Sequence, residues 1–372
     1  MTPPPAAVLI VCGDPSGDWH GSRLAAAMKR LDPSLNIIAV GGPLMRQQAQ
    51  EFLEDLASRG ISGFWEPLLH LKSLARLYGR LKALMSERKP RALVCVDYYG
   101  FNRWVLHAAS ALGIPAYYYV SPQVWASRPG RVKVLKRLVR KMLVIFPFEE
   151  RVYREAEVPC VFIGHPLLDV LPPPTDIRAL MELKDPVRVG LLPGSRPGEV
   201  RRHLPIFLEA YRRIKIRFPS SKALVFAARG LSDDFYDLSS CPGAELVRES
   251  DYSARRELDF AISSSGTATL ENALLGVPMV VAYRTSWLTY AIARMLIRVP
   301  YISIVNILSG RALVPEAIQG QANAEHIASL ALRALENPAK YAQAKRDLFD
   351  IRGLLGQSGA PEKAAKIVLS NG

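Results

Sequence analysis

Short apolar segments rich in β-branched residues recur along the chain, and helix-like segments separate them. Several are apolar at every position, which is typical of strands covered on both faces of a sheet. The strands expected in the first half are residues 7–12, 37–40, 92–96, 116–120, 142–145 and 160–163. Alternating strands and helices predict a parallel sheet, whose ligands bind beyond the carboxyl ends of the strands.

A proline-rich stretch, LPPPT at residues 171–175, interrupts this alternation and predicts a linker, because proline continues neither a helix nor a strand ladder. A second series follows, and its expected strands are residues 187–192, 222–227, 260–263 and 278–282. At 372 residues the chain is also longer than one hydrophobic core usually serves. We therefore predict an α/β protein with two doubly wound, Rossmann-like domains, residues 1–170 and 171–345, facing each other across a cleft. The sequence leaves open whether a helical segment, residues 346–372, packs back on the first domain.

The formal net charge of +14 predicts anionic partners. No nucleic-acid-binding motif accompanies the charge, which favours anionic lipid or phosphorylated substrates over nucleic acid. The four cysteines form no CxxC pair, which fits a reducing cytoplasm, and the six histidines lack metal-ligand spacing, so we predict no metal site. No apolar run is long enough to span a bilayer, although the protein could still lie on one.

The motif CGDPSGD at residues 12–18 joins the first predicted strand to a helix. Small residues let backbone N–H groups approach a ligand, and the start of a helix favours negative charge. The candidate binding residues of this turn are Gly13, Ser16, Gly17 and Asp18. Glycine-rich turns also occur for packing alone, and the turn by itself favours neither interpretation.

Asp97 ends an apolar strand at the predicted ligand edge of the sheet. A carboxylate there can accept the proton that an attacking hydroxyl loses, which makes Asp97 the candidate general base. The alternative is an N-cap of the helix that the pattern from Phe101 predicts.

Two motifs mark strand ends in the second domain. In LLPGSR at residues 191–196, Arg196 offers a fork of N–H donors to a diphosphate, next to the backbone of Gly194 and Ser195. In SSSGTATLE at residues 263–271, small and hydroxyl residues begin a helix, which is a phosphate-binding arrangement, although capping alone is the competing explanation. The candidates in this second motif are Ser264, Ser265, Gly266, Thr267 and Glu271, and Asn306 is a weaker candidate further along the chain.

Two segments have the composition of lipid-contacting surfaces. The first contains Phe64, Trp65, Leu68 and Leu69, with cations following. The second is a run of seven cations without an acid that includes Arg128 and Arg131. Both patterns fit contact with anionic lipid or acceptor phosphate, and equally an amphipathic core helix or a solvated basic face.

Taken in order, CGDPSGD, GGPLM, VDYYGFN, VSPQVWA, FPFE, IGHP, LLPGSR, SSGTATLE and NILSGR resemble the motifs of the lipid-A-disaccharide synthase family over nearly the whole chain. The resemblance implies a GT-B fold and an inverting transfer, without metal or cofactor, of 2,3-diacylglucosamine from UDP to 2,3-diacylglucosamine 1-phosphate. The first domain would take the acceptor at the membrane and the second would bind UDP. The enzyme would lie on the inner face of the inner membrane, and the sequence leaves open whether it forms a homodimer.

The resemblance also assigns roles to individual residues. Asp97 matches the essential aspartate of the family, Arg196 the arginine at the diphosphate, Glu271 the nucleotide-binding acid, and Asn306 a required asparagine. The turn from Gly13 to Asp18 would face the transferred sugar. Gly100 departs from the family, which usually has a second acid there. Another GT-B transferase, a UDP-sugar epimerase or a non-catalytic binding protein are the alternatives.

Overall fold

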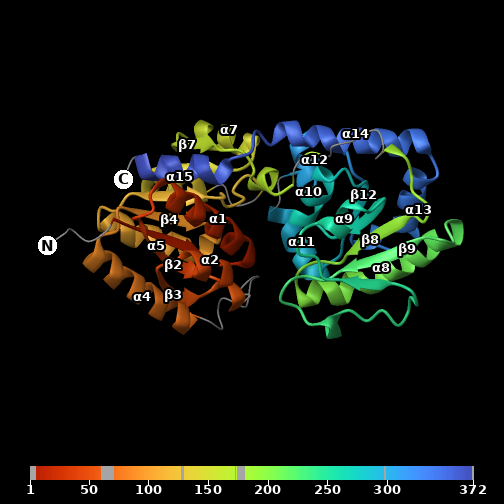
Figure 1. The fold of residues 1–372 in the computed structure, drawn as a ribbon, viewed down its shortest axis with the longest axis horizontal. Coiled ribbons are helices and arrows are strands. Elements are labelled where there is room, and N and C mark those ends of the chain that lie inside the picture. The colour runs from red at the N-terminus through yellow and green to blue at the C-terminus, as the bar shows by residue number, and fades with distance from the viewer. Residues whose placement is uncertain are drawn as a thin grey trace. The chain divides into compact units, whose positions relative to one another are not determined.

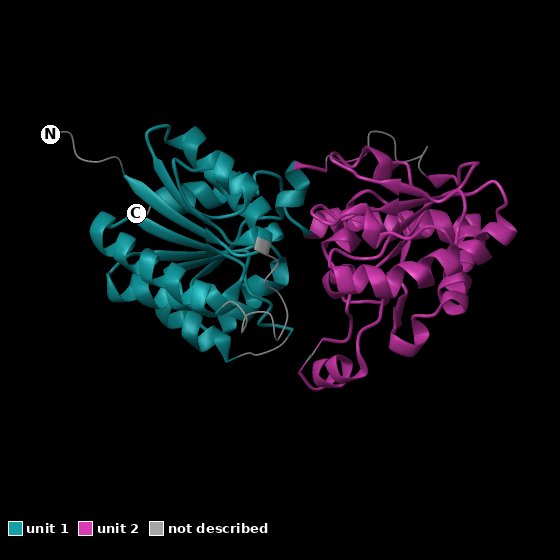
Figure 2. Cartoon of the chain, turned by 90° about the horizontal axis from the view of Figure 1, so that it is seen from below, with its two compact units in different colours: residues 1–169, 355–372 teal, residues 170–354 magenta. Residues whose placement is uncertain are grey.

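The computed structural model describes residues 6–59, 71–126, 130–171, 173, 181–296 and 299–370. The chain forms two compact units, which Figure 2 shows in different colours. Unit 1 comprises Met1–Asp169 and Leu355–Gly372, and unit 2 comprises Val170–Leu354. Each unit has one parallel sheet with helices on both faces (Figure 1), so the predicted α/β class with two Rossmann-like domains is confirmed.

The sheet of unit 1 has the strand order β3-β2-β1-β4-β5-β6-β7. Its strands are β1 (Ala7–Cys12), β2 (Asn36–Gly41), β3 (Glu51–Asp55), β4 (Ala92–Val96), β5 (Ala116–Tyr119), β6 (Lys141–Val144) and β7 (Cys160–Phe162). Its helices are α1 (Pro15–Leu31), α2 (Pro43–Gln48), α4 (Leu71–Arg88), α5 (Tyr99–Ala111), α6 (Arg131–Leu138), α7 (Pro147–Glu155) and α15 (Ala360–Ser370), with short 3₁₀ turns at Ala57–Arg59 and Pro166–Asp169.

The central strands of unit 1 are buried on both faces, as their unbroken apolar runs predict. On one face, alternate residues such as Leu9 and Val11 pack with the buried side of α4 and α5. On the other face, Val8 and Ile10 pack with α1 and with α15, which lies beside α1 (Figure 1). The last helix of the chain thus completes the core of the first unit.

The sheet of unit 2 has the order β10-β9-β8-β11-β12-β13. Its strands are β8 (Arg188–Leu192), β9 (Lys222–Phe226), β10 (Glu245–Val247), β11 (Phe260–Ser263), β12 (Met279–Tyr283) and β13 (Glu316–Ile318). Its helices are α8 (Pro197–Arg217), α9 (Ser253–Arg256), α10 (Thr267–Leu274), α11 (Trp287–Leu296), α12 (Ile304–Ser309), α13 (Ala324–Leu335) and α14 (Pro338–Leu354), with 3₁₀ turns at Asp233–Phe235 and Gln319–Gln321.

The bounds of the units differ slightly from the predicted domains. The chain changes unit after Asp169 and again after Leu354, whereas we predicted changes after residues 170 and 345. The second difference arises because α14 runs on to Leu354 while it packs against α10, α12 and α13 of unit 2. Most of the predicted linker lies outside the described residues.

Candidate functional site

Each sheet has one point where the strand order reverses, and the predicted motifs flank both points. In unit 1, β1 and β4 are neighbours, and the chain leaves them in opposite directions along the sheet. In unit 2, β8 and β11 have the same relation. A doubly wound sheet binds its ligands at the carboxyl end of such a pair. The fold therefore brings Gly13 and Asp97 to one reversal point, and Arg196 and Gly266 to the other.

The backbone at the reversal point of unit 1 is strained. Asp97 and Tyr98 have φ of +45° and +44°, and Val120, which follows the neighbouring strand, has φ of +58°. Left-handed backbone is uncommon outside glycine and a clear outlier for a β-branched residue. Gly13 allows this geometry, since a Cβ there would lie 2.0 Å from Cδ1 of Tyr98. Strain of this kind costs stability and clusters at functional sites.

The Asp97 carboxyl group lies in a poorly solvated, acidic environment. Burial, followed by the nearby carboxylate of Asp14, raises the pKa of Asp97 to about 7. The backbone carbonyl of Asp97 accepts hydrogen bonds from Tyr118 Oη at 2.5 Å and Asn102 Nδ2 at 2.8 Å. The side chain does not cap α5, because the N-cap residue is Tyr98. The capping alternative for Asp97 is therefore wrong, and its carboxylate is suited to accept a proton near neutral pH.

The first turn uses both of its acids to hold its own structure. Asp14 caps α1 by accepting a hydrogen bond from Gly17 N at 2.6 Å. Asp18 is buried, and its carboxylate accepts from the backbone N of Gly42 at 2.7 Å and of Leu44 and Met45 at 3.0 Å. Asp18 thus joins the turn to the start of α2.

The other candidates of this turn differ in exposure. Gly13 and Gly17 are buried, and the N–H of Gly17 is already bonded to Asp14. Ser16 is exposed. The binding role of this turn stays a prediction. Among its candidates, Ser16 has the side chain that a ligand can reach.

Glu149, the last residue of the FPFE motif, is a further acid near the same edge of the sheet, and the sequence alone assigns it no role. It lies in the first turn of α7 after β6, where its buried carboxylate accepts from Ser121 Oγ at 2.6 Å, Trp125 Nε1 at 3.2 Å and Phe146 N at 3.1 Å. Burial raises its pKa to about 7, against the effect of those donors. The sequence signal was the Pro-x-Glu start of a helix, which indicates capping and not a shared site.

In unit 2, the turn after β8 presents Arg196 to solvent. Gly194 has φ of +124°, and a Cβ there would lie 2.5 Å from Glu199 Oε2. The same oxygen accepts from Ser195 N at 3.1 Å. The Arg196 side chain is 61% exposed and meets Glu199 Oε1 at 3.4 Å. Because the guanidinium itself is largely exposed and its contact with Glu199 is long, it can turn to an anionic ligand at little cost.

The turn after β11 is bonded to its neighbours. Ser264 N donates to Leu192 O at 2.8 Å, which connects the start of this turn to the last residue of β8. Ser265 Oγ donates to Ile302 O at 2.8 Å. Gly266 and Thr267 lie at the start of α10, where backbone N–H groups favour an anion.

Glu271 and Asn306 are both engaged with protein groups. Glu271 accepts from Tyr252 Oη at 2.8 Å and forms an ion pair with Arg255. Asn306 is fully buried, and its amide bonds N and O of Val314 and Glu316 Oε1, each at 2.8 Å. Asn306 therefore holds the segment before β13 in place, and the ligand contacts of both residues stay predictions.

The two predicted lipid-contacting segments are only partly described. Phe64, Trp65, Leu68, Leu69 and Arg128 lie outside the described residues. Arg131 begins α6, and its guanidinium lies 4.5 Å from the ring centroid of Tyr99. The buried side of α6, Val132 and Leu135, belongs to the core of unit 1. The apolar positions Val132 and Leu135 are therefore used for packing. Arg131 is half-buried against Tyr99, whereas Lys133, Lys136 and Arg137 are exposed.

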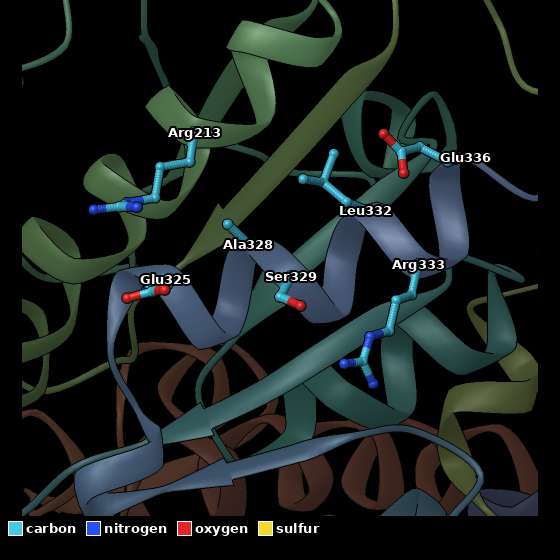
Figure 3. A pocket seen from close by; sticks show the side chains of 7 residues that line it. All are labelled: Arg213, Glu325, Ala328, Ser329, Leu332, Arg333 and Glu336. Atoms are coloured by element: carbon cyan, nitrogen blue, oxygen red, sulfur yellow. The ribbon is translucent and has the colours of Figure 1, made fainter.

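Three further observations concern the described part of the chain. There, no three His, Cys, Asp or Glu side chains come together as metal ligands, and none of the helices is long and apolar enough to cross a membrane. A depression between α8 and α13 is lined by Arg213, Glu325, Ala328, Ser329, Leu332, Arg333 and Glu336 (Figure 3). Its lining has charges of both signs and no turn that follows a strand, so we assign it no ligand.

Comparison with known proteins identifies the family. The sequence model of the family described as lipid-A-disaccharide synthetase matches residues 8–369. The chain is 42% identical to the lipid-A-disaccharide synthase of Geobacter metallireducens, over 99% of this chain and 98% of the relative. It is 40% identical to that of Syntrophus aciditrophicus, over 98% and 97% respectively.

Solved structures share the fold at low sequence identity. A UDP-GlcNAc 2-epimerase from Neisseria meningitidis, bound to UDP-GlcNAc, has a TM-score of 0.63 and 14% identity over 98% of this chain and 100% of its own. The glycotransferase of kitacinnamycin has a TM-score of 0.64 and 16% identity over 99% and 100%. Those likenesses support the GT-B fold alone. Since the family model and the relatives span nearly the whole sequence, this chain belongs to the lipid-A-disaccharide synthase family of glycosyltransferases.

Proposed function

We propose that this chain transfers 2,3-diacylglucosamine from its UDP derivative to 2,3-diacylglucosamine 1-phosphate, forming a β-1,6 disaccharide 1-phosphate and UDP. The family supplies the reaction. The observation that carries the proposal is Asp97, a carboxyl group with a pKa of about 7 on strained backbone at the reversal point of the first sheet. Groups with pKa values near the working pH are efficient general bases.

In the proposed reaction, Asp97 accepts the proton of the acceptor 6-hydroxyl as its oxygen bonds to the anomeric carbon of the donor. The bond from that carbon to the UDP oxygen breaks on the opposite face, which inverts the configuration. Arg196 and the backbone N–H groups at the start of α10 stabilise the negative charge that develops on the leaving diphosphate. The Glu271 carboxylate accepts hydrogen bonds from the ribose hydroxyls while it keeps its contacts with Tyr252 and Arg255.

The substrates also imply where the protein works. Both sugars carry acyl chains, which leave a bilayer only at a large cost in free energy. We propose that the protein lies peripherally on the cytoplasmic face of the inner membrane. Its 48 Lys and Arg residues outnumber its 34 Asp and Glu residues, and the resulting positive charge attracts anionic lipid. Whether the protein forms a homodimer is a separate question, which its mass in solution answers.

A turnover assay tests the proposal. Purified protein is incubated in detergent with both acylated substrates, and released UDP and disaccharide are measured with and without EDTA. We expect equal amounts of both products under both conditions. UDP release without disaccharide would contradict the proposed acceptor, and conversion of a UDP-sugar to its epimer without acceptor would support the epimerase alternative. Asp32→Asn is the control for Asp97→Asn, because Asp32 lies before β2, at the amino ends of the strands. Among the described residues, its carboxylate accepts hydrogen bonds only from Ser34.

A further inference from the structure

Helix α11 (Trp287–Leu296) carries apolar side chains but has no buried residue. Trp287, Leu288 and Met295 are 71%, 74% and 85% exposed, and Ile292 and Leu296 are exposed as well. At about 100° per residue, these five side chains fall on one half of the helix surface. A core helix would bury that half, so α11 presents an apolar face that the rest of unit 2 leaves uncovered.

Interactions local to α11 help to maintain its helical form. Ser286 Oγ accepts from Thr289 N at 3.2 Å and donates to Thr289 Oγ1 at 2.8 Å, which caps the start of the helix. The rings of Trp287 and Tyr290 meet edge to face with centroids 6.0 Å apart. These contacts favour a preformed helix over an extended loop.

The chain that leaves the sheet for α11 is fixed where it departs. Arg284 N donates to His203 Nε2 at 3.0 Å. Thr285 N donates to the Gln319 side-chain oxygen at 2.7 Å, and Gln319 Nε2 donates back to Thr285 O at 3.2 Å. His203 and Gln319 are buried, so the outgoing segment has a firm base.

The returning chain is fixed as well, and it meets the candidate nucleotide-binding turn. Ile302 N and Ser303 N donate to the carboxylate of Glu316 at 3.0 and 2.9 Å. The same carboxylate accepts from Asn306 Nδ2, and Ile302 O accepts from Ser265 Oγ. The segment that carries α11 is thus hydrogen-bonded to the turn after β11.

All the charged residues in the part of the sequence that contains α11 are positive. Between Glu271 and Glu316 the chain has no acidic residue and four arginines. Arg284 and Arg294 are both exposed, one beside the departing segment and one within the helix. An apolar face with an exposed Trp and flanking arginines is typical of a helix lying in the interface of an anionic bilayer.

We propose that α11 docks unit 2 on a bilayer that contains anionic phospholipid, with Trp287, Leu288 and Met295 inserted among the acyl chains. The bonds from Ser265 and Glu316 to the returning segment keep the nucleotide-binding turn close to that surface. This inference rests on the proposed function, because a lipid-linked sugar must be taken from a bilayer.

Vesicle binding tests the proposal independently of turnover. The probe is sedimentation of the full chain with vesicles of phosphatidylglycerol and phosphatidylethanolamine, compared with vesicles of phosphatidylcholine alone. We expect Trp287→Ser/Leu288→Ser/Met295→Ser to weaken binding to the anionic vesicles at least about tenfold. Arg294→Glu should weaken it too, and added salt should weaken binding of the parent chain. Tryptophan fluorescence of the parent chain should shift to the blue when vesicles are added, and the variant that lacks Trp287 should lose that shift.

A matched control separates docking from general loss of apolar surface. Trp104 and Ile216 are 50% and 78% exposed on α5 and α8, and Trp104→Ser/Ile216→Ser should leave vesicle binding unchanged. Turnover of detergent-dispersed substrates should be the same in all variants, since α11 contributes no group to the chemistry. Thermal unfolding checks that each variant is folded. Loss of the Trp287–Tyr290 and Tyr78–Trp104 ring contacts should lower the Tm by no more than about 4 °C.

Three outcomes would overturn the inference. Equal binding of the α11 variant and the parent chain would place the docking surface elsewhere. A change in mass in solution with no effect on vesicles would make the face a contact between two copies. Absence of vesicle binding by the parent chain would reject bilayer docking. Turnover in detergent is measured separately in every case, and its loss in the parent chain would reject the proposed transfer and not the docking surface.

Discussion

Replacing the Asp97 carboxylate by an amide tests the proposed base without disturbing the backbone. Asn tolerates the left-handed conformation at +45°, and the bonds from Tyr118 and Asn102 go to the backbone carbonyl, which the variant keeps. The amide cannot take up a proton. General base catalysis contributes about 10²- to 10⁴-fold, so we expect kcat of Asp97→Asn to fall by about that factor at pH 8. Binding of UDP, measured by calorimetry, should change little.

The pKa of about 7 gives this prediction a pH dependence. The base acts when ionised, and about nine-tenths of it is ionised at pH 8 but only about one-tenth at pH 6. The rate of the parent chain should therefore fall about tenfold for each pH unit below 7. The rate of Asp97→Asn should not show this fall below pH 7, whereas the rate of Asp32→Asn should show it.

Thermal stability should respond to Asp97→Asn in the opposite direction from the catalytic rate. Folding raises the pKa of Asp97 from 3.8 to about 7, so the folded state binds this proton more tightly than the unfolded state does. The resulting stability is fully present below pH 3.8 and is lost as the pH rises through 7. About three pKa units correspond to at most about 4 kcal/mol, a cost that the neutral amide avoids at pH 8. Asp97→Asn should thus unfold at or above the Tm of the parent chain. A lower Tm, or turnover within about threefold of the parent, would refute the assignment.

Three further substitutions have expectations that follow from contacts. Gly13→Ala should lower stability by about 1–3 kcal/mol and reduce turnover, because the new Cβ would meet the Tyr98 ring at 2.0 Å; urea unfolding measures the first effect. Asp18→Asn should cost about 1–3 kcal/mol at pH 8, because three backbone N–H groups lose a charged acceptor, and unchanged stability would contradict this. Arg196→Lys should leave Tm within about 1 °C but reduce kcat/KM about tenfold or more, because an exposed ammonium cannot hold a diphosphate with two N–H groups.

The sequence predicts the centres of both sheets better than their edges. β1, β4 and β11 begin and end at the predicted residues, because an unbroken apolar run is itself the signal of a strand buried on both faces. We missed β3, β10 and β13. β3 is the sequence EFLED, in which three of five residues are charged. Strands β10 and β13 are each only three residues long. Edge strands of this kind are fixed by their one neighbour and not by their own pattern.

The site divides in the same way. The position of Asp97, Arg196 and Gly266 at strand ends follows from the alternation of elements and could be predicted. The hydrogen-bond partners could not. Asp18 bonds residues more than twenty positions away, and Glu149 bonds Ser121, which no local pattern connects to it. Which acid is a base and which is a support depends on such long-range contacts.

The return of α15 to the sheet of unit 1 has a consequence for biosynthesis. Residues 360–370 leave the ribosome after all of unit 2, yet Ala364 and Val368 cover the side of the sheet formed by Val8 and Ile10. Part of the strand surface formed by Val8 and Ile10 therefore stays uncovered until residues 360–370 have been synthesised, and apolar surface exposed in this way promotes aggregation. Nonsense mutations or proteolysis near residue 355 would leave unit 2 complete but would remove the helix that covers Val8 and Ile10 in unit 1.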